Sequence, residues 1–387
     1  MILLQSRKTQ SVLIQAAYLG GLLSILVAGA ITARRNLDAQ GITSSFDFLW
    51  KATGWNLTFS LLPATTSDPY WWFLLMGFVN TIVLGLTGLA AATLLGGLVG
   101  MARVSANKAA RLLGTVYVEM FRNIPMIVQV FFWYGLASHL PGPRQSLEFG
   151  GLHLNNRGLY FPGFNVPVWS VMLFYAVVAL MLVLIIWVAT ARRFGNLAQG
   201  QRRRLIATVC AFGVACAIAV IYTGHAPGTD LTTAPELRGL NISGGYRLRP
   251  EFLAMAFSIA TYGAAYIGEI VRGGFNAVPQ GQTEAARSLG LTPWQTFVRI
   301  RLPIALRSML PILANQYVWL VKATTLGIAV GFADFFMIVL SSITQSGQTL
   351  EFIGILMGGF LLLNLSIAAI FNTINRRIAL KGHGVGR

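Results

Sequence analysis

A polar stretch that carries both signs of charge lies in residues 283–303, between two long apolar segments. These residues, TEAARSLGLTPWQTFVRIRLP, carry Glu284, Arg287, Arg299 and Arg301. Carboxylate and guanidinium groups form charge-assisted hydrogen bonds, which are stronger than bonds between neutral groups. The side chains therefore favour recognition of a partner surface, and the elements around them must hold them outside the apolar segments.

The first half of this segment predicts a short helix followed by a tight corner. Glu284 sits in the first turn of that helix and Arg287 nearer its end, as the helix dipole prefers. Gly290 fits the position after the helix, where a left-handed conformation costs glycine little. Ala285 and Ala286 are small enough to let another surface approach closely. We predict a corner that fits a groove on a partner; the alternative is an ordinary amphipathic loop at the lipid headgroups.

The second half predicts another short helix that begins at once. Thr292 fits the N-cap, Pro293 the first helical position, and Gln295 completes a capping box. We expect this helix to end near Arg301, because Pro303 disfavours helical geometry in the residue before it.

Catalytic and metal-binding patterns are absent from the sequence. No G-x-x-x-x-G-K-[ST] segment, H-E-x-x-H pair or G-x-S-x-G turn occurs. Cys210 and Cys216 share one apolar segment and are too few for a disulfide framework or a zinc site. The histidines all lie in expected loops or in the tail: His139, His153, His225 and His383. We expect no enzymatic activity, no metal site and no cofactor on this chain.

The composition indicates a membrane protein. Of 387 residues, 55% are hydrophobic and 11% are charged, whereas a soluble globular domain carries about 25% charged residues. Several windows of about 20 residues lack charge, which is the length that crosses a bilayer. The apolar segments are continuous, which argues against the alternating pattern of a β-barrel. We predict an all-α, polytopic transmembrane helical bundle of about eight spans: 12–32, 72–101, 113–138, 166–190, 205–223, 252–272, 304–332 and 353–375.

The basic residues indicate how the spans are oriented. With the N-terminus inside, roughly two thirds of the 29 Lys and Arg residues fall on the inner side, as the positive-inside rule requires. This topology accounts for the net charge of +17 without nucleic-acid binding. The first apolar run is longer than a signal-peptide core, so we expect an uncleaved span. Both termini are then inside, and residues 139–165 and 224–250, rich in Gly, Pro and Asn, form irregular outer loops.

Polar side chains within the spans are costly in the membrane and are candidates for function. Lys322 is the clearest, because its ammonium group could meet a substrate carboxylate in a transport pathway. Alternatively it pairs with a neighbouring helix or snorkels to the interface. The neutral candidates for the pathway are Gln129, Asn315, Gln316, Thr324 and Thr325. Hydrogen bonding between helices is the alternative for these residues.

Two pairs of opposite charge lie near the inner ends of their spans. Glu119 and Arg122 are three residues apart, as are Glu269 and Arg272, and this spacing allows ion pairs within a helix. We expect structural pairs or inner-gate contacts rather than substrate binding. Pro125 and Pro311 each remove a helical hydrogen bond and are expected to kink their spans.

Residues 283–303 resemble the signature loop of permease subunits of ABC importers. The matching positions are Glu284, Ala285, Ala286, Gly290, Ile300, Leu302 and Pro303. The segments YIGEIVRGGFNAVPQGQ (266–282) and YVEMFRNIPMIVQVFFWYG (117–135) are similar to the polar amino acid branch. The eight-span pattern resembles the larger permease of broad-specificity L-amino acid importers, and K-x-T-[ST]-L around Lys322 looks like a family feature.

The resemblance implies a type I (MetI-like) permease core with added parts. Residues 1–71 are an extra N-terminal span and periplasmic segment, and 72–387 are the permease domain, with insertion 139–250 carrying two more spans. The resemblance implies a protein of the bacterial inner membrane, in contact with membrane lipid, with both termini cytoplasmic. The implied partners are a second permease, an ATPase dimer that holds ATP and Mg, and a periplasmic amino acid-binding protein.

The resemblance also assigns roles to residues. It implies that residues 283–289 are a coupling helix that docks on the ATPase, with Glu284, Ala285, Ala286, Arg287, Gly290 and Pro303 as its site. The implied function is the transmembrane permease of an ATP-driven amino acid importer. Two alternatives are a self-contained secondary transporter, which usually shows internal repeats that we do not find, and a membrane enzyme, which lacks a catalytic constellation here.

Overall fold

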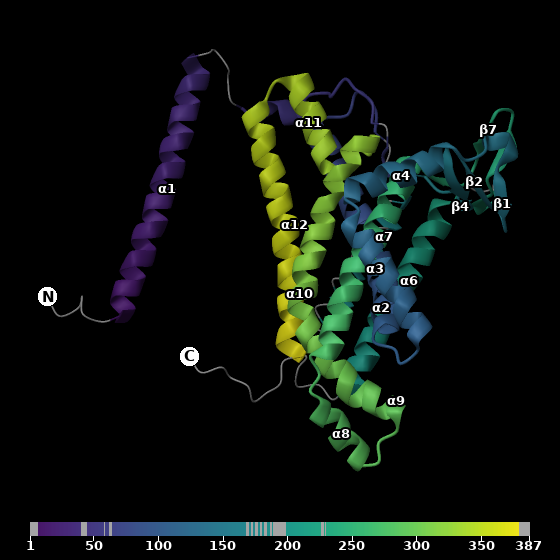
Figure 1. Cartoon of the computed structure of the whole chain (residues 1–387). Helices are drawn as coiled ribbons and strands as arrows, with labels where there is room; N and C mark the ends of the chain where they lie inside the picture. The colour runs from purple at the N-terminus through teal and green to yellow at the C-terminus, as the bar shows by residue number, and fades with distance from the viewer. Residues whose placement is uncertain are drawn as a thin grey trace.

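The computed structural model describes residues 7–39, 45–57, 59–61, 64–167, scattered positions between 170 and 188, 199–225, 228 and 230–378. Most of these residues are helical, which confirms the all-α prediction (Figure 1). The α-helices are α1 Arg7–Ala39, α2 Tyr70–Arg103, α3 Lys108–Asn123, α4 Met126–Ser138, α6 Gln199–Gly224, α7 Pro250–Asn276, α8 Gln280–Ser288, α9 Pro293–Thr296, α10 Leu302–Lys322, α11 Phe335–Ser346 and α12 Thr349–Ile378. Shorter helical turns are η2 Asp47–Trp50, η3 Pro143–Gln145, η5 Phe297–Arg301 and η6 Ala323–Val330.

Four helices of the described chain are long and apolar enough to cross a membrane: Tyr70–Arg103, Gly200–Gly224, Pro250–Asn276 and Thr349–Asn375. A bent pair, Pro293–Val330 with Phe335–Ser346, is a further candidate, broken by 51°. The predicted spans 72–101, 205–223, 252–272 and 353–375 therefore each correspond to one of these four helices. The predicted span 166–190 lies largely outside the described residues.

The third predicted span, 113–138, is not one helix. It divides into α3 and α4 at Ile124 and Pro125, both of which have extended backbone. The expected kink at Pro125 is a complete break, because proline also restricts the residue before it to extended conformations. Pro311, in contrast, lies inside α10 without ending it.

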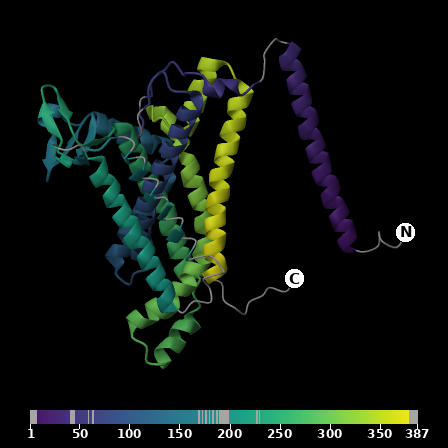
Figure 2. The same cartoon turned by 180° about the vertical axis from the view of Figure 1, so that it is seen from behind.

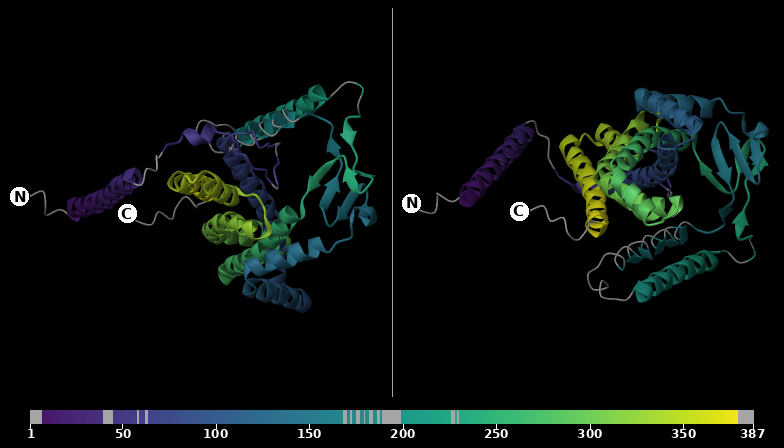
Figure 3. Two further views of the ribbon diagram at one scale, coloured as in Figure 1. Left: turned by 90° about the horizontal axis from the view of Figure 1, so that it is seen from above. Right: turned by 60° about the horizontal axis from the view of Figure 1, so that its bottom comes forward.

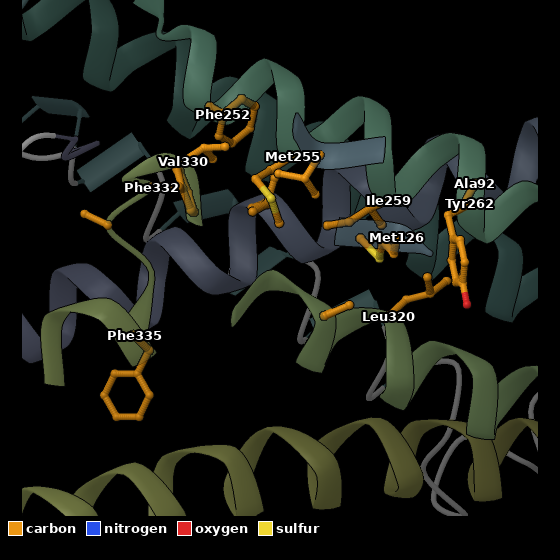
Figure 4. Close-up of a cluster of buried hydrophobic side chains, with 14 of the residues drawn as sticks. Ala92, Met126, Phe252, Met255, Ile259, Tyr262, Leu320, Val330, Phe332 and Phe335 are labelled. Carbon is orange, nitrogen blue, oxygen red and sulfur yellow. The ribbon is translucent and has the colours of Figure 1, made fainter. Parts of the chain in front are cut away.

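Helices α2 and α7 pack closely, because α2 presents glycines to bulky residues of α7. A Cβ on Gly88 would lie 2.6 Å from Ile259, and one on Gly96 would lie 2.7 Å from Ile267. Small residues let transmembrane helices approach and gain dispersion contacts where no hydrophobic driving force operates. Side chains from α2, α4, α7, α10 and η6 complete this core (Figure 4).

The N-terminal segment 45–69 is joined to the core by aromatic contacts. Phe59 lies 5.8 Å from Phe252 and 5.1 Å from Phe332, and Phe48 lies 4.7 Å from Phe352, measured between ring centroids. These three contacts attach the segment to α7, to the α10–α11 connection and to α12.

The outer loops of the insertion contain short strands, so the prediction of irregular loops is wrong. One antiparallel sheet has the order β1 (Leu147–Phe149), β2 (Leu152–Asn155), β3 (Gly158–Phe161) and β8 (Tyr246–Leu248). Two further pairs are β4 (Gly163–Phe164) with β5 (Thr232–Thr233), and β6 (Glu236–Arg238) with β7 (Asn241–Ser243). Tyr160 faces Arg247 across the sheet, with the guanidinium 5.5 Å from the ring centroid, and cross-strand pairs of this kind stabilise sheets.

Helix α6 lies at the periphery of the molecule (Figures 2 and 3). Its Gly213 faces Met181, since a Cβ on Gly213 would lie 2.5 Å from Met181 Sδ. The strands and the α8–α9 corner stand at opposite ends of the helices (Figure 1), as the predicted outer and inner sides require.

We predict that Gly96→Val destabilises the folded protein, because its side chain would overlap Ile267 and the Ala264 carbonyl. Overpacking of this kind costs about 2 kcal/mol. The matched control is Gly97→Val, since a Cβ at Gly97 meets nothing within 4 Å. Thermal unfolding in detergent should show a lower midpoint for Gly96→Val alone; equal midpoints would contradict the close α2–α7 contact.

Candidate functional site

The corner that joins α8 to α9 has the caps predicted for it. Thr292 Oγ1 accepts a hydrogen bond from Gln295 N, and Gln295 Oε1 accepts one from Thr292 N, at 3.2 and 3.0 Å. Gly290 has φ +72°, a left-handed conformation that favours glycine. The Leu291 N–H donates to Ala286 O at 3.1 Å and closes the end of α8. We call residues 280–301 the elbow.

The predicted end of the second helix near Arg301 is wrong. α9 continues through the π-helical turn η5 into α10, and Leu302 is helical with φ −62° and ψ −46°. The Leu302 N–H donates to Phe297 O, five residues back. Pro303 follows the π turn directly, in the first turn of α10. The elbow is therefore continuous with a membrane helix.

Two apolar side chains of the elbow are strongly exposed. Leu289 is 81% exposed and Trp294 is 71% exposed, on a segment that also carries several charges. Ala285 is exposed as expected, but Ala286 is only 3% exposed and packs within the chain. A large apolar patch with a polar rim is typical of a protein interaction site.

The elbow is also held to α7. The rings of Phe275, near the end of α7, and Phe297 of η5 stack with centroids 5.5 Å apart and planes 14° apart. Arg301 Cζ lies over the Phe275 ring at 5.7 Å from its centroid. The elbow is therefore in contact with α7 as well as joined to α10.

The predicted pair Glu269–Arg272 forms and has a third member. Arg272 Nη2 donates to Glu269 Oε1 at 2.6 Å, and Arg103 Nη1 of α2 donates to Glu269 Oε2. Sequence spacing could not reveal Arg103, which is 166 residues away and which the topology assigned to an inner loop. This cluster ties the C-terminal end of α2 to the last turns of α7.

The pair Glu119–Arg122 behaves differently. The ion pairs formed by the described residues do not include it. The Arg122 guanidinium instead lies 5.1 Å from the centroid of the Tyr266 ring on α7. Tyr117 Oη also donates to Thr261 O at 2.9 Å, so α3 is attached to α7 through aromatic side chains.

Gln129 is buried, and it bridges the break between α3 and α4. Its Nε2 donates to Phe121 O at 2.9 Å and Ile124 O at 3.1 Å, two carbonyls near the end of α3. Its Oε1 accepts from Thr261 Oγ1 at 3.2 Å. These bonds favour the structural alternative for Gln129 over substrate contact.

The other neutral candidates differ in how far their side chains are exposed. Thr324 is buried and donates to Val321 O, and Thr325 donates to Lys322 O, each at 2.9 Å. Gln316 is half-buried. The structure therefore brings only part of the predicted pathway set to a surface.

Lys322 and Asn315 share an exposed face of α10. Lys322 is the last residue of that helix, and Trp319 lies between them at helical spacing. The Trp319 ring stacks on Tyr262 of α7, with centroids 5.2 Å apart, so this face has a fixed conformation next to α7.

Asn80 and Thr81 confirm that polar side chains in spans bond between helices. Asn80 Nδ2 donates to Ala333 O at 2.8 Å, and Phe335 N donates to Thr81 Oγ1 at 3.0 Å. They hold α2 to the start of α11. Within the described residues, no group of three or more His, Cys, Asp or Glu side chains could hold a metal.

We predict that Glu269→Gln weakens the inner end of the bundle, because Arg103, whose side chain is only 9% exposed, loses its carboxylate. An unpaired, largely buried charge costs about 2 kcal/mol. Glu119→Gln is the matched control, because Glu119 is exposed. Proteolysis of the inner α2–α3 connection in inverted vesicles should accelerate in the Glu269 variant only; equal rates would contradict this role.

Comparison with known proteins agrees with these features. Residues 242–380 match a family model described as a binding-protein-dependent transport system inner membrane component. The chain is 37% identical over 350 residues to the putative amino-acid ABC transporter permease protein YhdX of Escherichia coli (strain K12), covering 89% of this chain and 88% of that protein.

Two further relatives are similar over most of their length. The general L-amino acid transport system permease protein AapQ of Rhizobium johnstonii is 36% identical over 352 residues, covering 89% of this chain and 86% of AapQ. The glutamate/glutamine/aspartate/asparagine transport system permease protein BztB of Rhodobacter capsulatus is 30% identical over 420 residues, covering 98% of this chain and 96% of BztB. The predicted resemblance is confirmed: this multi-pass inner-membrane protein belongs to the family of amino-acid ABC transporter permeases.

Proposed function

We propose that this chain is the membrane permease of an ATP-driven amino acid importer, with the elbow as the point where an ATPase acts. The observation that carries the proposal is the exposed apolar pair Leu289 and Trp294 on an element continuous with α10. The names of the three relatives, all permeases of amino acid transport systems, support the substrate class.

The elbow suits the transfer of force between subunits. The left-handed Gly290 ends α8, and the Thr292–Gln295 capping box fixes the start of α9. Both helices pack on η5. A rigid element held in a groove of an ATPase would move as one body when the ATPase closes. Because η5 joins the elbow to α10 without a break, α10 would move with it.

Within this proposal, ATP hydrolysis takes place on a separate ATPase subunit, which holds ATP and Mg. Glu284, Ala285, Arg287 and Gly290 form the docking surface together with Leu289 and Trp294. A second permease completes the pathway, and a periplasmic binding protein delivers the amino acid. Both termini are cytoplasmic, on the same side as the elbow.

The exposed face of α10 is the part of the pathway that this chain supplies. Asn315 and Lys322 lie on it and offer an amide and an ammonium group. A zwitterionic amino acid needs a cation for its carboxylate and neutral hydrogen-bonding groups around it. Gln316 lies at the edge of this face, half-buried.

We predict that Trp294→Asp combined with Leu289→Asp abolishes both ATPase binding and uptake, because two charges replace the apolar docking surface. Gly290→Pro should do the same, since proline fixes φ near −65° and this position has φ +72°. The measurements are co-purification of the ATPase in mild detergent and ATP-driven uptake in proteoliposomes that contain all subunits.

The matched control is Phe149→Asp, on an apolar side chain that is also strongly exposed, at 63%, but lies on β1 at the other end of the molecule. It should leave co-purification of the ATPase unchanged. Uptake driven by an ion gradient through this chain alone would overturn the proposal in favour of a secondary transporter.

We predict that Lys322→Ala raises the KM for uptake at least about tenfold, because a charge-assisted hydrogen bond to the substrate carboxylate contributes about 1.5–3 kcal/mol. Lys322→Arg, which keeps the charge, is the control and should retain most of the affinity. Unchanged kinetics in the alanine variant, with normal protein levels, would show that Lys322 serves packing or a subunit contact.

A further inference from the structure

An apolar groove of about 280 Å³ lies between α6 and residues 177–184. Helix α6 contributes Thr208, Val209, Phe212, Gly213 and Cys216, and four apolar side chains from 177–184 form the other wall. The groove is open on one side, because Phe212 is 72% exposed and Thr208 is exposed as well. None of its lining residues belongs to the elbow or to α10.

The described helices of the bundle do not cover this groove. Helix α6 stands at the edge of the molecule (Figures 2 and 3), and among the described residues α2, α7, α10 and α12 make no extensive contact with it. The hydrocarbon core of a bilayer contains no water to fill such a groove, so lipid acyl chains or another protein must occupy it.

The position of the groove along α6 matches the acyl layer of one leaflet. At about 1.5 Å per residue, Thr208 lies about 9 Å and Cys216 about 21 Å beyond Arg202. One leaflet has about 15 Å of hydrocarbon behind a headgroup layer about 5–7 Å thick. With Arg202 at the level of the lipid phosphates, the groove therefore spans the hydrocarbon of the same leaflet.

Arginines stand at the start of α6, at the end of the molecule that carries the elbow (Figure 2). Arg204 is four residues before Thr208, and Arg202 is seven before Val209. Both therefore lie on the side of α6 that forms the groove. The positive-inside rule explains basic residues at this end of a span, but it does not require them to line up with a groove. A guanidinium group binds phosphate through two parallel hydrogen bonds.

We propose that this groove is a binding site for an anionic phospholipid of the cytoplasmic leaflet. One acyl chain lies against Phe212 and Cys216, and the phosphate binds Arg202 and Arg204. Only the choice of leaflet rests on the proposed function, through the orientation of the elbow; the binding chemistry does not.

The charge pattern selects the occupant. A zwitterionic phosphatidylethanolamine would bring an ammonium group next to the two arginines, whereas an anionic headgroup adds no positive charge there. A helix of another subunit is the rival occupant. It would use the apolar lining but would place no phosphate at the arginines, so the combination of groove and arginines favours lipid.

The first test is native mass spectrometry of the purified full-length chain, delipidated in detergent and titrated with phosphatidylglycerol. The variants are Arg202→Gln, which removes a phosphate ligand, and Cys216→Trp, which fills the groove. Their matched controls are Arg203→Gln and Cys210→Trp. Arg203 is seven residues before Cys210 on α6, and neither side chain lines the groove.

We expect the affinity for phosphatidylglycerol to fall about fivefold in Arg202→Gln, the effect of one basic residue at an anionic lipid, and further in Cys216→Trp. Both controls should bind like the unmodified chain. Equal affinity in all five proteins would overturn the proposal. Equal affinity for phosphatidylethanolamine, or displacement of phosphatidylglycerol by inorganic phosphate at constant ionic strength, would overturn it as well.

The second test identifies the occupant in the membrane. Phosphatidylglycerol with a photoreactive group in its acyl chain should label residues 177–184 and 208–216 of the unmodified chain, so this result stands even where a variant fails to fold. A photoreactive residue in place of Phe212 should crosslink to lipid. A crosslink from this position to another protein subunit, or labelling spread evenly over all exposed helices, would contradict the proposal.

Discussion

The unbroken helical path from α9 through η5 into α10 is the constraint on which the account depends. A loop at this point would absorb any force applied to the elbow, because loop dihedral angles change easily. The π turn instead carries the helix up to Pro303, and the Phe275–Phe297 stack at 5.5 Å joins the same point to α7. In the proposed function, movement of the elbow would therefore move α10 and α7 with it.

The membrane part is built so that such movement stays collective. Glycines of α2 fit directly against Ile259 and Ile267 of α7, and Asn80 and Thr81 bond to backbone groups at the start of α11. Asn80, Thr81 and Gln129 each satisfy groups where a helix breaks or begins. In a bilayer such groups have no water to bond, so the breaks in the α3–α4 and α10–α11 regions are held in one conformation.

The sequence predicted the features that depend on near neighbours. The left-handed Gly290 and the Thr292–Gln295 capping box were expected from local sequence and are found, and Glu269–Arg272 followed from helical spacing. Features that depend on distant contacts were missed. Arg103 reaches Glu269 across 166 residues, and β3 pairs with β8 through Leu159 and Leu248. One local expectation also failed: the helix does not end near Arg301, because a π turn carries it on to Pro303. The role of Lys322 was left open by the sequence and stays a prediction, with its side chain exposed at the end of α10.

The central claim is that the elbow lies on the cytoplasmic side and is covered by an ATPase. It can be measured directly with Leu289→Cys, after Cys210 and Cys216 of α6 are replaced by serine, using a thiol reagent that does not cross membranes. The account predicts no labelling in intact cells and labelling in inverted vesicles only after the ATPase is removed. Labelling from outside intact cells, or labelling in inverted vesicles that is unaffected by the ATPase, would contradict it.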